Sequence, residues 1–316
     1  MSVGLQKFAG KQLAEWLYVK RVTSFDQMTN ISLKGREALQ AKYTIGRHAP
    51  IREAVSVDGT RKYLFEVGEQ FIESVYIPED DRATLCVSTQ AGCKMGCRFC
   101  MTGTLGFHGH LSAADILNQI FYFDDLTNVV FMGEGEPMDN LDHVLRALEI
   151  MTADYGCAWS PKRITVSTVG IPAMKRFLEQ SECHLAVSMH NPFAIERKEI
   201  MPAEKLLSIT DIVALLKQYD WSHQRRVSFE YICWAGQNDT PRHAKELLRL
   251  LKGLPCRINL IRFHAGVDRA FPASDEKQME WFRDYLTDNG ITTTIRKSRG
   301  EDILAACGML VNSLTR

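Results

Sequence analysis

The stretch GCKMGCRFCMTG, residues 92–103, places three cysteines within eight positions, at Cys93, Cys97 and Cys100. Their spacing is C-x3-C-x2-C, so only the last two form the C-x2-C pair that is common in structural zinc sites. A cuboidal iron–sulfur cluster held by three cysteines leaves one iron atom without a protein ligand and free to bind a small molecule. The spacing favours such a cluster. A zinc site completed by His108 or His110 is the alternative.

The chain around this loop alternates between strand-like and helix-like segments. Amphipathic stretches with helical spacing, such as LDHVLRALEIM at 141–151, separate most of the apolar runs. This alternation predicts an α/β fold with a parallel sheet, curled into a partial (βα)6 barrel like a TIM barrel, and ITTTIRK at 291–297 predicts one more strand. The six strand-like runs are LCVST, NVVFMG, RITVST, HLAVSMH, VSFEYIC and RINLIRF.

The residues before the barrel fall into two further parts. Residues 1–50 are expected to form a small helical accessory domain, because Leu13, Trp16 and Leu17 recur on one side at helical spacing. Residues 51–82 contain three short runs with partial alternation and predict a β-rich connector, with a hairpin at DGT, residues 58–60. Residues 83–316 would then form the core domain.

Composition limits the classes of protein to consider. The 316 residues have a net charge of zero, which argues against binding nucleic acid through overall charge alone. The N-terminal 52 residues nevertheless carry nine Lys or Arg against three acidic residues, and Arg296, Lys297 and Arg299 form a second basic run. No apolar run is long enough to span a membrane, and there is no signal peptide, so we expect a cytoplasmic protein.

Candidate functional residues cluster at the ends of the predicted strands. The three-cysteine loop follows the first strand, and GEGEP at 133–137 follows the second. Ser167, His190 and His264 lie at the ends of the third, fourth and sixth strands. Active sites of parallel barrels lie at the C-terminal ends of the strands, so we expect these side chains to meet at one rim.

The three-cysteine spacing, with Phe99 before the last cysteine, resembles the radical S-adenosylmethionine (SAM) superfamily. The resemblance extends to one family. The blocks TLCVSTQAGCKMGCRFC, FMGEGEPMDN, ITVSTVGIP, LAVSMHNP, RVSFEYI, GLPCRINLI and SRGEDILAACG resemble the RlmN/Cfr family of RNA adenine methyltransferases. They occur in the family's order from Glu73 to the C-terminus, and the N-terminal helical stretch is similar as well.

This resemblance implies a role for each matching residue. Cys93, Cys97 and Cys100 would hold a [4Fe-4S] cluster. Seven residues would bind SAM; one of them, His264, stands where the family usually has Asn. The implied SAM-binding residues are Gly135, Glu136, Ser167, Ser188, Met189, His190 and His264.

Two further cysteines and one glutamate carry the implied mechanism. On composition alone Cys86 and Cys307 would be small buried residues, and Glu73 an exposed strand residue. The resemblance implies instead that Cys307 is methylated by one of two SAM molecules used per turnover. Cys86 would be the resolving thiol that forms a transient disulfide with Cys307, and Glu73 would accept a proton. The ring carbon is not nucleophilic, whereas a thiolate can attack the methyl group of SAM.

The implied substrates are an adenine in the peptidyl-transferase region of 23S rRNA and an adenine in the tRNA anticodon loop, with a flavodoxin-type electron donor. We expect a monomer. The C8-methylating branch of the family, of the Cfr type, shares every catalytic motif, and the terminal blocks favour the C2 branch. A zinc-stabilised RNA-binding module without catalysis is the third hypothesis.

Overall fold

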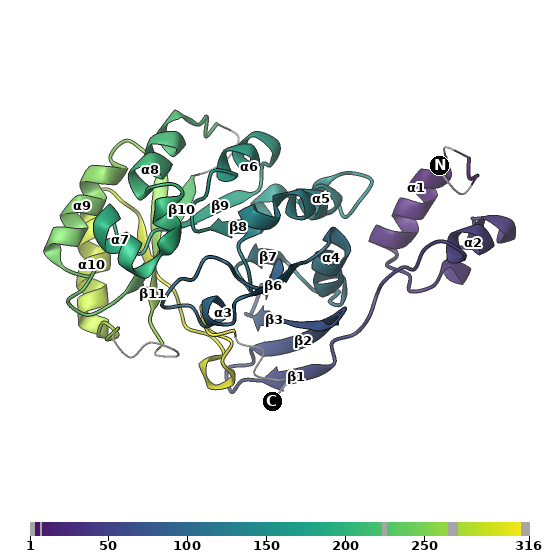
Figure 1. Cartoon of the computed structure of the whole chain (residues 1–316), viewed down its shortest axis with the longest axis horizontal. Coiled ribbons are helices and arrows are strands. Elements are labelled where there is room, and N and C mark those ends of the chain that lie inside the picture. The colour runs from purple at the N-terminus through teal and green to yellow at the C-terminus, as the bar shows by residue number, and fades with distance from the viewer. Residues whose placement is uncertain (1–3, 7, 223–225, 265–270, 311–316) are drawn as a thin grey trace.

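A computed structural model of the chain describes residues 4–6, 8–222, 226–264 and 271–310 (Figure 1). Its centre is one ten-stranded sheet with the order β1-β2-β3-β4-β7-β8-β9-β10-β11-β12. From β4 onward, each strand runs parallel to the next. These parallel strands are β4 (Ala83–Cys86), β7 (Asn128–Phe131), β8 (Ile164–Thr168), β9 (His184–Ser188), β10 (Val227–Cys233), β11 (Cys256–Arg262) and β12 (Thr293–Ile295).

Helices connect the parallel strands, as the alternating sequence pattern predicts. The α/β barrel fold is therefore confirmed, and β12 is the expected additional strand. None of the helices in the described part of the chain is both long and apolar enough to cross a membrane. The helices of the barrel are α3 (Met101–Thr104), α4 (Ala113–Phe121), α5 (Leu141–Thr152), α6 (Met174–Gln180), α7 (Ala194–Ile200), α8 (Ile209–Gln218), α9 (Pro241–Leu251) and α10 (Glu276–Asp288).

Shorter elements complete the barrel. A two-stranded sheet, β5 (Gln90–Gly92) with β6 (Phe107–His110), brackets the three-cysteine loop. Single 3-10 turns lie at Pro137–Asn140, Pro161–Arg163, Pro202–Lys205 and Glu301–Ile303.

The predicted connector extends the same sheet. Strands β1 (Arg52–Val55), β2 (Arg61–Val67) and β3 (Gln70–Pro78) are antiparallel, and β3 pairs with β4 so that Val75 lies opposite Cys86. The hairpin expected at residues 58–60 is present. The domain boundary expected after residue 82 therefore lies between β3 and β4, which pair with each other in the sheet.

The N-terminal segment folds into helices, as its spacing predicts. It contains α1 (Ala9–Ala14), a π-helical continuation at Glu15–Val19, a 3-10 turn at Phe25–Gln27 and α2 (Leu33–Gln40). Its own apolar cluster includes Leu13, Trp16 and Leu17, packed against buried residues such as Met28. Figure 1 shows α1 on the side of the barrel where α4 and α5 lie, with α2 farther out. The Arg21 guanidinium donates to the Phe123 carbonyl at 2.7 Å, so this basic residue contacts the barrel.

Side chains alternate between the two faces of each parallel strand. In β8, Ile164, Val166 and Thr168 are buried, whereas Thr165 and Ser167 are only half-buried. Ser167 and Thr165 line cavities at opposite ends of the barrel interior. The apolar face therefore packs under the helices, and the inner face carries polar side chains.

Candidate active site

A cavity of about 910 Å³, including its open mouth, lies at the C-terminal ends of the parallel strands. It brings together residues that are up to 217 positions apart, from Cys93 to Leu310. The expected common rim is therefore present. The predicted site residues that line this cavity are Cys93, Cys97, Cys100, Gly135, Glu136, Ser167, Ser188, His190 and Cys307.

The three-cysteine loop is shaped by backbone contacts. The Cys100 N–H donates to the Cys97 carbonyl at 3.1 Å, and the Arg98 N–H donates to the Ile200 carbonyl at 3.0 Å. Gly92, just before the loop, has a φ of 70°, and a Cβ atom there would lie 1.9 Å from the Gly106 carbonyl oxygen. Only glycine fits this close approach.

The loop thiols are protonated when no cation is near them. Burial raises the pKa of Cys93 to about 12 and raises the pKa values of Cys97 and Cys100 as well. A bound metal centre would lower these pKa values, because its positive charge stabilises thiolates.

The donor set fits an iron–sulfur cluster better than a zinc ion. His108 Nε2 contacts the Leu105 carbonyl at 3.0 Å, and His110 Nδ1 contacts the Gln90 amide at 3.0 Å, so each contact occupies one of the two ring nitrogens. Over the described ranges, no three His, Cys, Asp or Glu side chains are placed to hold a single metal ion. A cuboidal cluster binds each thiolate to a different iron atom and does not require the three sulfur atoms to converge on one point.

The GEGEP segment forms one wall of the cavity, and close contacts restrict its backbone conformation. Gly135 has a φ of 97°, and a Cβ atom there would lie 2.6 Å from the Cβ of Gln90. The Glu136 carboxylate accepts hydrogen bonds from the Thr168 hydroxyl at 2.6 Å and from the Val169 N–H at 2.9 Å. Burial raises the pKa of Glu136 to about 7. These contacts fix the carboxylate at the cavity wall, where an ammonium group of a ligand would stabilise its charged form.

His190 is held in an unusual backbone conformation at the end of β9. Its φ is 54°, and its Nδ1 accepts a hydrogen bond from the Ile232 N–H at 3.1 Å. The remaining ring nitrogen, Nε2, therefore carries the proton as a donor. Burial, and secondarily the Arg197 charge, lowers the pKa of His190 to about 3, so the ring is neutral.

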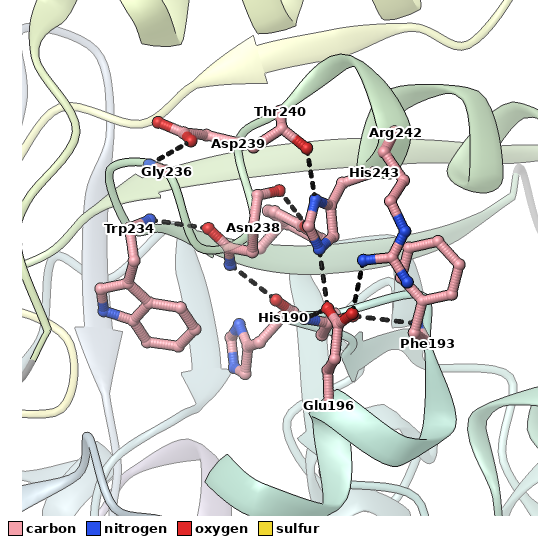
Figure 2. Close-up of polar contacts among 12 residues, drawn as sticks. His190, Phe193, Glu196, Trp234, Gly236, Asn238, Asp239, Thr240, Arg242 and His243 are labelled. Carbon is pink, nitrogen blue, oxygen red and sulfur yellow. Dashed lines mark hydrogen bonds and ion pairs between the residues drawn. The ribbon is translucent and has the colours of Figure 1, made fainter.

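Asn238 stabilises this conformation, as Figure 2 shows. Its amide donates to the His190 carbonyl and to the Ile232 carbonyl, both at 2.7 Å. Its side-chain oxygen accepts from the Trp234 N–H at 2.7 Å. One buried side chain thus satisfies three backbone groups beside the cavity, and nothing in the local sequence singled it out.

A second polar network lies behind the first. His243 Nε2 contacts Glu196 at 2.8 Å, Arg242 pairs with the same carboxylate at 2.5 Å, and the Thr240 hydroxyl contacts His243 Nδ1 at 2.7 Å (Figure 2). Glu196 also accepts from the Asn191 amide at 3.0 Å. The network joins α7 to α9 and supports the turn that follows His190.

Arg197 ties the ends of two strands together. It is fully buried and pairs with Glu204. It donates to the carbonyls of Val169 at 2.6 Å and Ser188 at 2.8 Å, which follow β8 and end β9. Its Nε donates to the carbonyl of Met189, a predicted SAM contact that is itself fully buried. Arg197 was not recognisable from the sequence, because an arginine in an amphipathic helix is usually exposed.

Cys86 and Cys307 face a second cavity of about 760 Å³. Cys307 lines both cavities. Burial raises the pKa of Cys86 to about 12 and that of Cys307 to about 11, whereas the Arg296 charge lowers both. All nine cysteines are free thiols.

The segment that carries Cys307 is attached to the three-cysteine loop. The Met101 N–H donates to the Gly308 carbonyl at 2.8 Å, and the Thr102 hydroxyl donates to the Leu310 carbonyl at 2.9 Å. These contacts bring Cys307 to the cluster end of the cavity.

Glu73 is fully buried on β3, which does not agree with an exposed strand position. Its carboxylate pairs with Lys62 on β2 at 3.0 Å, and the Lys62 side chain is fully buried as well. Lys62 also donates to the Leu304 carbonyl at 3.3 Å, so the pair contacts the segment that precedes Cys307. No pattern in the sequence distinguished Lys62.

His264 and the C-terminal basic run lie in surroundings that differ from those predicted. His264 lines the second cavity, where its Nε2 contacts the Ser298 hydroxyl at 2.5 Å and its Nδ1 pairs with Glu301 at 2.9 Å. In the C-terminal basic run, Arg296 pairs with Glu230 at 3.2 Å inside the barrel. Lys297 is exposed, whereas Arg299 is half-buried and pairs with Glu79 at 3.6 Å.

Comparison with known proteins agrees with this geometry. Residues 87–260 match the radical SAM superfamily, and residues 1–45 match the ribosomal RNA large subunit methyltransferase N-terminal domain. A probable dual-specificity RNA methyltransferase RlmN of Bacteroides thetaiotaomicron is 60% identical over 313 residues, covering 98% of this chain and 91% of that protein. The chain belongs to the RlmN family of radical SAM methyltransferases.

A second RlmN relative and a solved structure of a radical SAM methyltransferase agree with this assignment in sequence and in fold. The corresponding protein of Porphyromonas gingivalis is 57% identical over 317 residues, covering 99% of this chain and 93% of that protein. The crystal structure of a radical SAM methyltransferase from Sphaerobacter thermophilus superposes with a TM-score of 0.90 at 35% identity, covering 98% of this chain and 94% of that chain. Membership of this family implies a [4Fe-4S] cluster and SAM, and favours the cluster over the zinc alternative.

Proposed function

We propose that this protein methylates C2 of an adenine in RNA, at adenine 2503 of 23S rRNA and adenine 37 of tRNA. The observation that carries the proposal is the position of Cys307. It lines the cavity that holds the three-cysteine loop, and it also lines the cavity that holds Cys86. A single sulfur atom with access to both cavities suits a methyl carrier between SAM and a second substrate.

The proposed reaction uses two SAM molecules and begins at Cys307. As a thiolate, Cys307 takes a methyl group from the first SAM by nucleophilic displacement. When bound at Cys93, Cys97 and Cys100, the cluster supplies the electron that cleaves the second SAM to methionine and a 5′-deoxyadenosyl radical. Gly135, Glu136, Ser167, Ser188 and His190 line the cavity where this SAM would bind.

Three residues would complete the transfer. The S-methyl group of Cys307 would lose a hydrogen atom to the deoxyadenosyl radical, and its carbon would bond to C2 of the adenine. The adduct would then give up one electron, equivalent to the electron used to cleave SAM, and Glu73, oriented by Lys62, would accept the ring proton. Cys86, as a thiolate, would attack the sulfur of Cys307; the bond between that sulfur and the transferred carbon would break, the carbon would take up a proton to become the methyl group, and a disulfide between the two cysteines would remain. Met189 would contribute to SAM binding through the backbone, and His264 would act at the second cavity.

The target must be an adenine whose ring edge is exposed, because the reacting carbon has to approach it directly. Unpaired loops of folded RNA meet this condition. Exposed cations of the N-terminal segment, such as Lys11 and Lys34, would contact the RNA, together with Lys297 near Cys307. We further propose that the protein acts as a monomer in the cytoplasm, with a flavodoxin-type electron donor.

The test is the identity of the methylated nucleoside. Reconstitute the protein without oxygen, supply SAM, a reductant and unmodified 23S rRNA or tRNA, and digest the RNA for mass spectrometry against standards. We expect 2-methyladenosine with the wild type and none with Cys307→Ala. Cys157→Ala is the matched control, because this half-buried cysteine lies outside both cavities, and it should retain activity.

Other products would change the conclusion. 8-Methyladenosine would assign the chain to the C8 chemistry of the Cfr type. Unmodified RNA from an enzyme that binds its cluster and cleaves SAM would refute both adenine assignments. Bound zinc without iron would revive the non-catalytic RNA-binding module.

A further inference from the structure

A third cavity lies at the opposite end of the barrel from the candidate active site. It has a volume of about 1110 Å³ including its mouth. Its lining comes from the beginnings of the parallel strands, with Thr84 of β4, Asn128 of β7, Thr165 of β8 and His184 of β9. We call this cavity the cationic mouth, for the residues described next.

The sequence explains why this end is hollow. Barrels of this type normally fill their interior with layers of bulky branched side chains. Here most of the lining residues are short and polar or are cations. Ser228 and Arg257, which face each other across β10 and β11, illustrate both kinds, with a hydrogen bond of 2.8 Å between them.

The lining carries five cations and one carboxylate. Arg82 pairs with Glu79, and Arg296 pairs with Glu230. The other three, Lys162, Arg226 and Arg257, have no carboxylate within 4.0 Å in the part of the chain that the structure describes. The full set of charged residues around the mouth is Arg82, Lys162, Glu182, His184, Arg226, Arg257 and Arg296.

The cations repel one another at this site. Burial, followed by the Arg226 charge, lowers the pKa of Arg257. Burial, followed by the charges of Arg257 and Arg226, lowers the pKa of His184 to about 4. Arg226 and Arg257 are half-buried with no carboxylate partner among the described residues; this arrangement is unfavourable, and a bound anion would offset the repulsion between them.

We propose that the cationic mouth binds a phosphate-class oxyanion through Arg226, Arg257 and Lys162. Guanidinium groups match tetrahedral oxyanions with paired, charge-assisted hydrogen bonds. The His184 ring, whose Nε2 contacts the Ser228 hydroxyl at 2.7 Å, forms part of the same wall. The anion is a free phosphate compound or a backbone phosphate of RNA, which present the same group. This site is independent of the proposed methylation.

The test uses the full-length reconstituted protein and inorganic phosphate as the probe. Phosphate is titrated by isothermal calorimetry, with sodium chloride at equal ionic strength as the reference. We expect Arg226→Gln and Arg257→Gln each to weaken phosphate binding by about tenfold, because each removes a charge-assisted contact. Lys245→Gln, an exposed cation on α9, is the matched control and should bind phosphate like the wild type.

Further variants keep the test decisive. Arg257→Lys retains the charge and should lose less affinity than Arg257→Gln. Lys162→Gln changes an exposed residue at the edge of the mouth, so it tests the site even if an arginine variant does not fold. The proposal is overturned if phosphate binds no better than chloride, if the arginine variants bind like the wild type, or if Lys245→Gln is equally impaired.

A second measurement separates the two sources of phosphate. Binding of labelled tRNA is followed by fluorescence anisotropy in the wild type and in Arg226→Gln. If the site takes an RNA phosphate, the variant binds tRNA more weakly and inorganic phosphate competes with tRNA. If it takes a free phosphate compound, tRNA affinity is unchanged while phosphate binding is lost.

Discussion

The ion pair between Lys62 and Glu73 provides the sharpest test of the structure. The two charged atoms are 3.0 Å apart and both side chains are fully buried. We expect Glu73→Gln, which removes the negative charge with little change in shape, to leave the Lys62 ammonium without its carboxylate. Removing one partner of a buried pair costs about 3–5 kcal/mol, because the remaining charge cannot be solvated.

The glutamine oxygen can still accept one hydrogen bond from Lys62, so the lower end of that range applies, about 3 kcal/mol. Each kcal/mol lowers the Tm of a domain of this size class by about 2–4 °C, so the variant should melt roughly 6–12 °C below the wild type. Differential scanning fluorimetry measures this shift. The double variant Lys62→Met with Glu73→Leu should recover most of it, because an apolar pair of similar volume removes both buried charges.

The control is Glu149→Gln on α5, whose partner Arg146 lies 2.8 Å away and which is largely exposed. A pair exposed to water contributes about 0–1 kcal/mol, so this variant should melt within roughly 2–4 °C of the wild type. If Glu73→Gln and Glu149→Gln lower the Tm equally, the Lys62–Glu73 pair is hydrated in solution and does not contribute the energy expected of a buried pair.

Three further predictions follow from the barrel interior. Burial lowers the pKa of His184 in the folded protein to about 4, below the usual value near 6.5 that applies to the unfolded chain. Between these two pH values, His184 is protonated in the unfolded chain but neutral in the folded protein, so a falling pH favours unfolding. Stability should therefore decrease by roughly 2 kcal/mol between pH 7 and pH 5 in urea titrations, and His184→Asn should show a smaller decrease. Gly135→Ala places a Cβ atom 2.6 Å from that of Gln90, so it should weaken SAM binding at least tenfold by calorimetry, and unchanged affinity would contradict the close approach. Asn238→Ala leaves three backbone groups unpaired beside His190 and should cost about 3 kcal/mol in urea unfolding; a loss below about 1 kcal/mol would show that water replaces the amide.

Regular patterns in the sequence predicted most of the fold and much of the cavity lining. Strand and helix periodicity located the parallel strands, and the rule that parallel strands end at one rim placed Ser167 and His190 beside the cysteine loop. The loop itself was recognisable because its three cysteines lie within eight positions of one another at a distinctive spacing. These features depend on neighbouring residues or on a general rule of the fold, so the sequence alone contains them.

Long-range contacts could not be predicted in this way. Lys62 and Glu73 lie on neighbouring antiparallel strands, and only their register shows that the two side chains are paired in the core. Asn238 and Arg197 satisfy carbonyl groups of distant segments, and their local sequence resembles that of ordinary loop and helix residues.

The sequence by itself determined the order of the elements, the cysteine spacing and the alternation of side chains along each strand, because these are local properties of the chain. Only the tertiary structure decided that Cys307 opens into two cavities and that Arg226, Arg257 and Lys162 surround a third. Which polar side chains are compensated, and which remain without a partner, depends on segments far apart in the sequence that meet only when the sheet curls. The physical reason is that burial and electrostatic pairing are properties of the packed chain as a whole.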